Sequence, residues 1–442
     1  MGCVMKRYPK YKDSGVEWIA KIPEHWSAKP LCRVVSCNDD ALADDTRVDT
    51  NLRYVDISSV DHTAGIKQVT DVRFGDAPSR ARRKAKVGDV VISTVRTYLK
   101  AVAPVTPEHA DCTYSTGFAV LRPRPHQVEP GFLKWMMLNE LLVQTVEAHS
   151  EGLSYPAINA TELVKLKALI PPPAEQRAIT AALNRETARI DALISKKARF
   201  IELLKEKGRA IITHVVTKGL DPKVKMKSSR VEWIGSVPNH WRVGNIKMLL
   251  SEVEYGLSET ASDFGNIEFL TMGNVQDGEI IRTRQKFLSN VPKHMLLREG
   301  DILFNRTNSL DLVGKVGIFR ERGSDPVTFA SYLVRLRCKG QINPEYLTYY
   351  LGCDPFLAVA RTMAFPSVSQ ANLNPNRYGF LPAPIPPKEE QDAIVDTIAA
   401  SEKRLKHLVS KTQTSIDLLK ERRSALITAA VTGQIDLREE VA

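Results

Sequence analysis

Two long stretches of the chain carry apolar residues at steps of three, four and seven, the spacing of a coiled-coil seam. In the first stretch the seam positions are Ile179, Leu183, Ile190, Ile194, Ile201, Leu204, Ile211 and Val215. In the second stretch they are Ile394, Ile398, Leu405, Val409, Ile416, Leu419, Leu426 and Ala430. Each stretch predicts a helix of about 40 residues, or ~60 Å at 1.5 Å per residue. A helix of this length needs a partner to bury its apolar stripe, and we expect each helix to pack against the other.

A different pattern precedes each helix. Short apolar runs of strand length alternate with the turn residues Gly, Asp, Asn and Pro. The runs are 52–57, 87–93, 118–122, 267–272, 301–304 and 333–337. Gly88-Asp89 and Gly300-Asp301 predict turns that lead into buried strands. Short helices are expected at 131–147 and 344–360.

Both patterns occur twice because the chain repeats itself with a shift of about 215 residues. Val-Glu-Trp-Ile at 16–19, followed by Pro-x-His-Trp at 23–26, returns at 231–234 and 238–241. Ile-Pro-Pro at 170–172, followed by Glu175-Gln176, returns at 385–387 with Glu390-Gln391. A period this long indicates a duplicated globular unit rather than a solenoid. Two such units in one chain can act as a built-in dimer with a pseudo-two-fold axis.

These patterns together predict an α+β protein. Two pseudo-symmetric globular mixed α/β domains are joined by two long helices packed as an antiparallel coiled coil. The predicted segments are a globular domain at 1–170, a long helix at 171–219, a linker at 220–230, a globular domain at 231–385, a long helix at 386–437 and a tail at 438–442.

Charge points toward a polyanionic partner. The chain has 62 Lys and Arg against 51 Asp and Glu, a net charge of +11. Such an excess favours nucleic acid, although a soluble protein can also be basic without binding it. No run of about 18 apolar residues predicts a membrane span, and the first residues lack the apolar core of a signal peptide. We therefore expect a cytoplasmic protein without a membrane partner.

Several sequence motifs typical of catalytic and cofactor sites are absent from the chain. Gly314-Lys315 is followed by Val316, so it fails the phosphate-loop pattern. No dinucleotide or methyl-donor glycine motif follows a strand, and the six cysteines lack the spacing of a zinc site. We predict no catalytic residue, no metal site and no cofactor in this chain. His25-Trp26 and His240-Trp241 are interpreted as packed corners rather than general bases.

Basic residues gather in loops that flank the predicted strands, where recognition is commonly carried. The candidate DNA-binding residues are Arg73, Arg80, Arg82, Arg83, Lys84, Lys86, Arg96, Lys100, Arg282, Arg284, Lys286, Asn305, Arg306, Asn308 and Lys315. Arg can read guanine with two hydrogen bonds, and Asn can read adenine. Arg96 and Arg306, just after the Gly-Asp strands, are the strongest candidates. The alternative is that these basic residues lie in solvent-exposed loops and bind no ligand.

The duplicated motifs, in this order, resemble the specificity subunit of a type I restriction-modification enzyme. The resemblance covers nearly the whole chain. It implies two target recognition domains that each read one part of a split double-stranded DNA site, and two helices that fix the gap between the parts. It also implies two modification (methyltransferase) subunits docked largely on the helices and two restriction (ATP-dependent nuclease-translocase) subunits. S-adenosylmethionine, ATP and magnesium are then expected in those partner subunits.

Other functions stay open at the level of sequence. A stand-alone regulator with two reading heads would bind a bipartite site without partners. A single-chain nuclease or methyltransferase would need a metal or methyl-donor site. A coiled-coil scaffold with basic domains would show no sequence preference. Arg96 follows its Gly-Asp pair two residues later than Arg306 does, so roles in the two halves do not transfer one to one.

Overall fold

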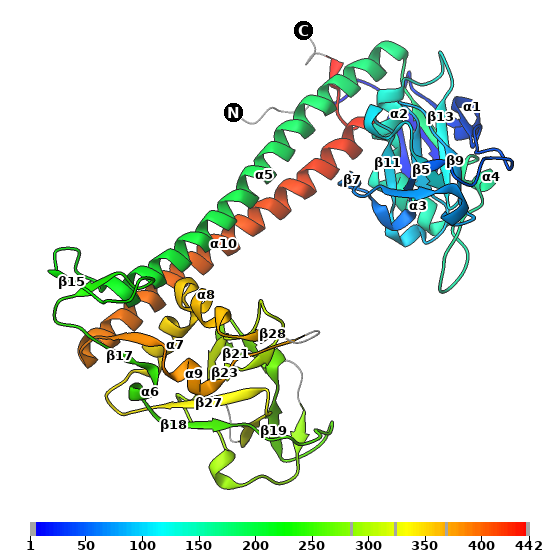
Figure 1. Ribbon diagram of the computed structural model, residues 1–442. Helices are drawn as coiled ribbons and strands as arrows, with labels where there is room; N and C mark the ends of the chain where they lie inside the picture. Colours follow the sequence, from blue (N-terminus) through cyan, green and yellow to red (C-terminus); the bar gives the residue numbers. More distant parts are fainter. Residues whose placement is uncertain (1–5, 283–285, 322–324, 367–369, 439–442) are drawn as a thin grey trace. The chain divides into compact units, whose positions relative to one another are not determined.

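The computed structural model describes residues 6–282, 286–321, 325–366 and 370–438. It forms two compact units, which we call unit 1 and unit 2 (Figure 1). Unit 1 runs up to Ala198 and resumes at Thr414, and unit 2 is Arg199–Gln413. Each of the two long helices, α5 (Pro173–Lys218) and α10 (Lys388–Val431), therefore contributes one part to each unit.

Unit 1 contains two four-stranded sheets. The first, in strand order, is β11 (Val102–Pro104), β10 (Val90–Ser93), β13 (Phe118–Pro123) and β4 (Val35–Cys37), all antiparallel. The second is β8 (Thr70–Arg73), β5 (Asn51–Val55), β12 (Thr113–Ser115) and β9 (Ala81–Lys84), in which β5 and β12 are parallel. Two-stranded pairs are β1 (Tyr11–Val16) with β2 (Ile19–Pro23), β3 (Ser27–Pro30) with β14 (Lys167–Ile170), and β6 (Val60–Asp61) with β7 (Gly65–Ile66). The short helices are α1 (Leu31–Val34), α2 (Pro130–Met137), α3 (Glu140–Ala148) and α4 (Ala160–Leu163).

Unit 2 repeats this plan with a longer sheet. Its order is β18 (Leu250–Tyr255), β27 (Leu333–Cys338), β23 (Ile302–Asn305), β25 (Val316–Ile318), β21 (Gly278–Ile280) and β20 (Val275–Gln276). A second sheet is β22 (Phe287–Leu288), β19 (Ile267–Leu270) and β26 (Val327–Phe329), and a third is β24 (Thr307–Asn308), β29 (Ala371–Asn372) and β28 (Phe365–Pro366). Two-stranded pairs are β15 (Met226–Ser228) with β16 (Ser236–Pro238) and β17 (Arg242–Asn245) with β30 (Pro382–Ile385). The short helices are α6 (Ile246–Leu249), α7 (Pro344–Gly352), α8 (Asp354–Thr362) and α9 (Pro375–Gly379).

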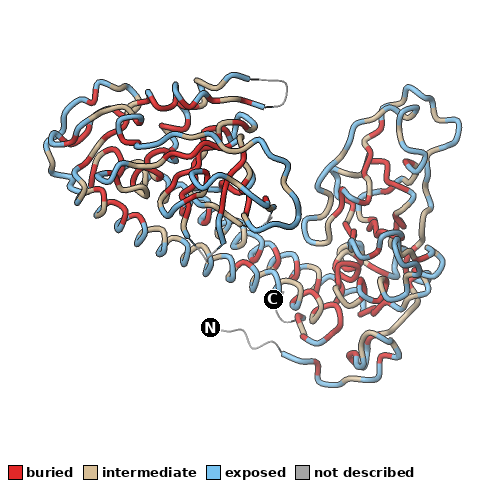
Figure 2. The backbone as a smooth tube through the Cα atoms, turned by 90° about the horizontal axis from the view of Figure 1, so that it is seen from below, coloured by how far each residue is buried: buried red, intermediate tan, exposed pale blue. Residues whose placement is uncertain are grey.

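The central strand of each unit is buried on both faces, which explains its unbroken apolar run. In β10, Val90 and Ile92 join a core with the helices, while Val91 joins a core between the two sheets. In β23, Ile302 joins the core with the helices, and Leu303 joins a second core on the opposite face of the strand. Side chains that alternate between faces are the geometric consequence of strand pleating. Figure 2 shows the buried residues of each unit gathered inside its globular part and along the adjoining parts of the long helices.

The long helices pack antiparallel within each unit, as the seams predict. In unit 1 the first part of α5 lies beside the last part of α10 (Figure 1), and Arg423 Nε lies 2.9 Å from Asp191 Oδ1. The buried residues shared there are Ile179, Leu183, Ile190, Leu426 and Ala430. In unit 2 the end of α5 meets the start of α10, and the buried residues are Val215, Ile394 and Ile398. Replacing one of the buried Ile or Leu residues with Ala costs about 2–5 kcal/mol in a well-packed core.

Both long helices end at a glycine with left-handed backbone. Gly219 has φ +75° and Gly433 has φ +70°. A Cβ on Gly433 would lie 2.4 Å from Pro23 Cδ, so only glycine fits there. The second helix therefore ends at Val431 rather than at 437. The residues after it, including Ile435 and Leu437, return to the core of unit 1.

The short elements differ from their predictions in detail. The predicted helix at 131–147 is two helices, because Asn139 caps α3 by accepting from Leu141 N at 3.2 Å. The helix at 344–360 is likewise divided, with Pro355 in the first turn of α8. The predicted linker at 220–230 contains strand β15. All six predicted strand runs contain a strand, although the Gly-Asp turn delays the start of β10 to Val90.

Candidate nucleic-acid interface

The Gly-Asp turns begin strands β10 and β23, and the two strongest DNA-binding candidates, Arg96 and Arg306, lie just beyond the far ends of these strands. Gly88 has φ +91° and Gly300 φ +82°, and a Cβ on either would come within 3.2 Å of a proline that begins a helix. The aspartate that follows each glycine is 1% exposed. Such a turn fixes where the central strand begins, and therefore where its other end emerges.

Each buried aspartate is paired with an arginine on the neighbouring strand. Arg122 Nη2 donates to Asp89 Oδ2 at 2.9 Å, and Arg337 Nε donates to Asp301 Oδ1 at 2.7 Å. Arg122 also donates to Asp40, and this bond holds the pKa of the Asp40 carboxyl below its usual range. Bidentate pairs of this kind satisfy the charge that burial would otherwise penalise. The sequence reading missed these pairs, although Arg122 and Arg337 occupy matching positions of the repeat.

Arg96 emerges beyond the end of β10 in unit 1. Its backbone is left-handed, with φ +53°, which is uncommon for a residue with a side chain. The side chain is exposed, and its guanidinium carbon lies 5.1 Å from the centre of the Tyr155 ring. This is the geometry of a cation–π contact.

Arg306 follows β23 in unit 2 and has a similar partner. Its guanidinium carbon lies 5.2 Å from the centre of the Tyr255 ring, at the end of β18. Its backbone N donates to Tyr332 O at 3.0 Å, which fixes the start of the side chain. The predicted Arg candidates therefore occupy comparable places in their units.

Several other candidates are already paired with carboxylates. The pairs are Arg80 with Asp56, Lys86 with Asp40, Lys100 with Glu140, Arg282 with Glu268, Lys286 with Asp263, and Lys315 with Asp277. Glu268 is 3% exposed, so Arg282 neutralises a buried charge and serves the fold of unit 2 first. Arg284 lies outside the described residues.

The cluster at 80–86 is not the loop that the sequence predicts. Arg82, Arg83 and Lys84 belong to β9, an edge strand of the second sheet of unit 1. Arg82 lies over the Phe74 ring at 4.7 Å, and exposed Arg73 ends the opposite edge strand β8. Exposed basic side chains therefore lie on both edges of this sheet, with Arg73 on β8 and Lys84 on β9.

Two predicted asparagines differ in accessibility. Asn305 is 1% exposed and donates to Met272 O at 3.4 Å. Its position inside the central strand argues against direct contact with a base, so this candidate is corrected to a structural residue. Asn308 is half-buried in β24 and accepts from Ser309 N at 2.8 Å.

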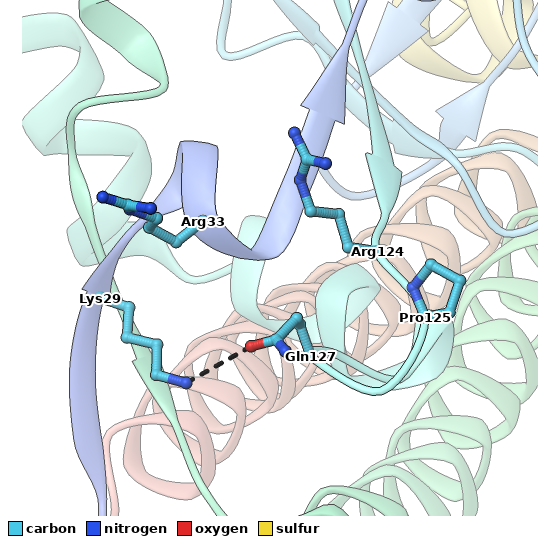
Figure 3. Close-up of a pocket in the computed structure, with 5 residues that line it drawn as sticks. All are labelled: Lys29, Arg33, Arg124, Pro125 and Gln127. Carbon is cyan, nitrogen blue, oxygen red and sulfur yellow. Dashed lines mark hydrogen bonds between the residues drawn. The ribbon is translucent and has the colours of Figure 1, made fainter.

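A further basic hollow of about 610 Å³ lies in unit 1, lined by Lys29, Arg33, Arg124, Pro125 and Gln127. Figure 3 shows that the guanidinium groups of Arg33 and Arg124 point away from the contact between Lys29 and Gln127. Arg124 Nε donates to Val35 O at 3.1 Å. The cations therefore do not surround one point, and this hollow is not a built anion site.

The duplicated His-Trp and Glu-Gln motifs prove to be the two halves of one structural contact. His25 Nε2 lies 2.8 Å from Glu175 Oε2, and Trp26 is fully buried. His240 lies at the same distance from Glu390 beside fully buried Trp241. The buried tryptophans fit the interpretation of both His-Trp pairs as packed corners.

The described residues contain no cluster of three or more His, Cys, Asp or Glu that could hold a metal. Burial raises the pKa of the Cys338 thiol to about 12 and that of Cys353 to about 11, which keeps these thiols protonated. Among the helices described, none is long and apolar enough to cross a membrane.

Comparisons with known proteins give one consistent result, although no protein-family model matches the chain. The chain is 23% identical over 323 residues to the EcoKI type I restriction enzyme specificity subunit of Escherichia coli K12, spanning 71% of this chain and 67% of that protein. It is 26% identical over 171 residues to the putative MjaX specificity subunit of Methanocaldococcus jannaschii, spanning 38% of this chain and 40% of that protein.

Two solved structures share the fold. One is a chain from a study of complex assembly and conformational transition in a type I restriction-modification system, with a TM-score of 0.72, 22% identity and coverage of 94% of this chain and 100% of that chain. The other is the HsdS subunit of Thermoanaerobacter tengcongensis, with a TM-score of 0.54, 23% identity and coverage of 94% and 98%.

The fold is thus the duplicated α+β architecture of restriction-modification specificity proteins. The chain is a homologue of the specificity subunits of type I restriction enzymes, and the resemblance predicted from its motifs is confirmed.

Proposed function

We propose that this chain is the DNA-recognition subunit of a type I restriction-modification complex. Unit 1 reads one half of a bipartite double-stranded DNA target, and unit 2 reads the other. The chain itself is non-catalytic and positions two modification subunits and two restriction subunits. S-adenosylmethionine, ATP and magnesium act in those partners. A cytoplasmic location is part of the same proposal.

The observation that carries the proposal is the placement of Arg96 and Arg306. Each follows the central strand of its unit on a frame that the repeat keeps alike, held by a buried Asp–Arg pair. The loops around them differ in sequence. A shared scaffold with different loops suits two domains that recognise two different DNA sequences, because recognition residues commonly lie on loops held by a rigid scaffold.

Charge supports DNA as the ligand. The net charge is +11, and the edge strands β8 and β9 of unit 1 present Arg73, Arg83 and Lys84 beyond its core. Such residues suit phosphate contacts, which set affinity and register without reading sequence.

The experiment is reconstitution with the modification subunits of a type I system as candidate partners. Methyl transfer from S-adenosylmethionine would be measured on a library of random DNA, followed by sequencing of modified sites. The complex should modify a bipartite target with a fixed gap, and each component alone should modify none. Robust methylation or cleavage by the purified chain without partners, or modification without any preferred site, would overturn the proposal.

A further inference from the structure

In both units an arginine beyond the central strand rests on an exposed tyrosine ring. The distances from guanidinium carbon to ring centre are 5.1 Å for Arg96 over Tyr155 and 5.2 Å for Arg306 over Tyr255. Tyr155 is 65% exposed and Tyr255 is 47% exposed. These rings are therefore accessible at the surface rather than fixed in a core.

The two arginines do not occupy equivalent positions of the repeat. Ile158 N donates to Thr94 O at 2.9 Å in unit 1, and Leu373 N donates to Arg306 O at 2.8 Å in unit 2. The backbone position of Arg306 thus matches Thr94, and Arg96 lies two residues further on. Because the positions differ, duplication of the chain alone does not explain why both guanidinium groups lie over a tyrosine ring.

The tyrosines also come from different elements. Tyr155 lies in a tight loop closed by two hydrogen bonds of 2.9 Å between the backbones of Glu151 and Ala157. Within that loop Gly152 has φ +109°, and a Cβ there would lie 3.2 Å from Tyr155 O. Tyr255 instead ends the edge strand β18 and pairs with Val334. Backbone hydrogen bonds thus fix the main chain of each tyrosine, and with it the point from which the ring reaches the arginine.

A ring over one face of a guanidinium restricts the side chain but leaves N–H groups at the edge free. The planar fork of arginine then presents two donors at once, which matches the O6 and N7 acceptors of guanine in the major groove. In the described residues, the contact made by the guanidinium of Arg96 and by that of Arg306 is with a tyrosine ring rather than with a carboxylate. The donors are therefore positioned without being neutralised.

The surroundings favour a base edge over a phosphate. Around Arg96, exposed apolar residues are Val95, Tyr98 and Leu99 on the same loop and Leu153 on the loop of Tyr155. Leu310 and Leu312 are exposed on the segment after Arg306. Phosphate contacts are typically made by groups of cations, whereas apolar side chains contact base methyl groups and base faces.

We propose that Arg96 and Arg306 each read a guanine, one in each half of the target, and that Tyr155 and Tyr255 are the positioning residues that orient them. This inference rests on the proposed function and adds residues and a base to it. Each tyrosine acts through its ring, so the hydroxyl group is dispensable.

The test uses the reconstituted complex and the preferences it shows on a randomised DNA library. Tyr255→Leu should relax the preference for one G·C pair in one half-site, and Tyr155→Leu should do so in the other. Arg306→Lys, which keeps the charge but loses the fork, should relax the same pair as Tyr255→Leu. Tyr255→Phe and Tyr155→Phe should keep the wild-type preference, because the ring remains. We expect at least about a tenfold loss of discrimination at the affected pair, within the range given for one good bidentate contact.

Phe380→Leu is the matched control in unit 2. Phe380 is also exposed and lies under a cation, with Lys247 5.7 Å from its ring centre, but it follows α9 rather than the central strand. Its replacement should leave base preference unchanged.

Three results separate the possibilities. Wild-type preference in both Tyr→Leu variants, with the wild-type complex modifying a defined bipartite target, would overturn the inference alone. A uniform loss across all sites with a shallower salt dependence would assign a phosphate contact and also overturn it. If the wild-type complex shows no defined target, the proposed function fails instead. Thermal melting of each variant identifies loss of folding. If Tyr255→Leu fails to fold, the base preference of Arg306→Lys tests the guanine contact in unit 2 instead.

Discussion

His240 and Glu390 are 150 residues apart in the chain, yet Nε2 of the histidine lies 2.8 Å from Oε2 of the glutamate. His25 and Glu175 repeat this contact in unit 1. The two most conspicuous motifs of the sequence therefore meet, one from the start of the globular part and the other from the first turns of a long helix. The contact fixes the helix direction against the domain that it leaves.

The two contacts are completed differently. In unit 2, Trp241 Nε1 donates to Glu390 at 2.9 Å. In unit 1, the Tyr8 hydroxyl donates to Glu175, and burial raises the pKa of Tyr8 above its ordinary value, so it remains a donor. Glu175 is 5% exposed and bonds to both Tyr8 and His25.

Glu175→Ala should therefore destabilise unit 1 by about 1–3 kcal/mol, because it leaves a buried hydroxyl without its acceptor. Chemical unfolding followed by fluorescence would measure the loss, with the buried Trp26 as reporter. Glu202→Ala on the same helix is the control, since Glu202 is exposed and its ion pair among the described residues is with exposed Lys205. Equal stabilities of the two variants would contradict a structural role for the repeated contact.

Acid should weaken the Arg122 network of unit 1. The hydrogen bond from Arg122 lowers the pKa of Asp40 in the folded state. A lowered carboxyl pKa contributes stability above the unfolded value of about 3.9, and this contribution is lost as pH falls through the folded pKa. Asp40→Asn should thus flatten the dependence of stability on pH below about 4. Unfolding midpoints measured from pH 6 to pH 2 would check this, with exposed Asp44→Asn as control.

The antiparallel packing predicts a specific cross-link in unit 1. Arg423 Nε lies 2.9 Å from Asp191 Oδ1 across the two helices, so cysteines at these positions should be joined by a bifunctional thiol reagent about as long as the arginine side chain that it replaces. In a parallel pairing at the repeat shift of about 215, position 191 would instead face Lys406. Cysteines at 191 and 406 should remain unlinked by the same reagent on denaturing gels, and a cross-link between them would contradict the arrangement.

The periodic parts of the fold were the most predictable from sequence. The seam from Ile179 to Val215 depends only on local spacing, and so do the apolar runs that became β10 and β23. The end of α10 was missed because it depends on Gly433 packing against Pro23, about 400 residues away in the chain.

The site was less predictable than the fold. Arg96 and Arg306 could be selected because they follow a recognisable turn and strand. Their ring partners could not, since Tyr155 and Tyr255 occupy unrelated positions of the repeat. Sequence also cannot show that Asn305 points inward or that Arg282 is taken up by buried Glu268, because both depend on tertiary neighbours.

Specificity should be modular between the two units. Exchanging residues 231–385 for the matching segment of a relative should change one half of the target modified by the reconstituted complex. The other half and the gap should stay unchanged, because unit 1 keeps its own core and loops. Sequencing of methylated sites would show this directly. Simultaneous change of both halves would contradict the assignment of one half-site to each unit.

The gap between half-sites should follow the length of the long helices. Seven residues added to α5 between Ser195 and Phe200, with seven added to α10 between Ser410 and Gln413, would keep the seam in phase. The addition lengthens each helix by ~10 Å, comparable to about three base pairs at ~3.4 Å of rise each. The variant complex should prefer a target with a correspondingly wider gap and unchanged half-sites. A control with the same insertion in α5 alone breaks the pairing of the two seams and should lose stability instead. An unchanged preferred gap in the double insertion, with both half-sites still recognised, would mean that spacing is set by something other than helix length.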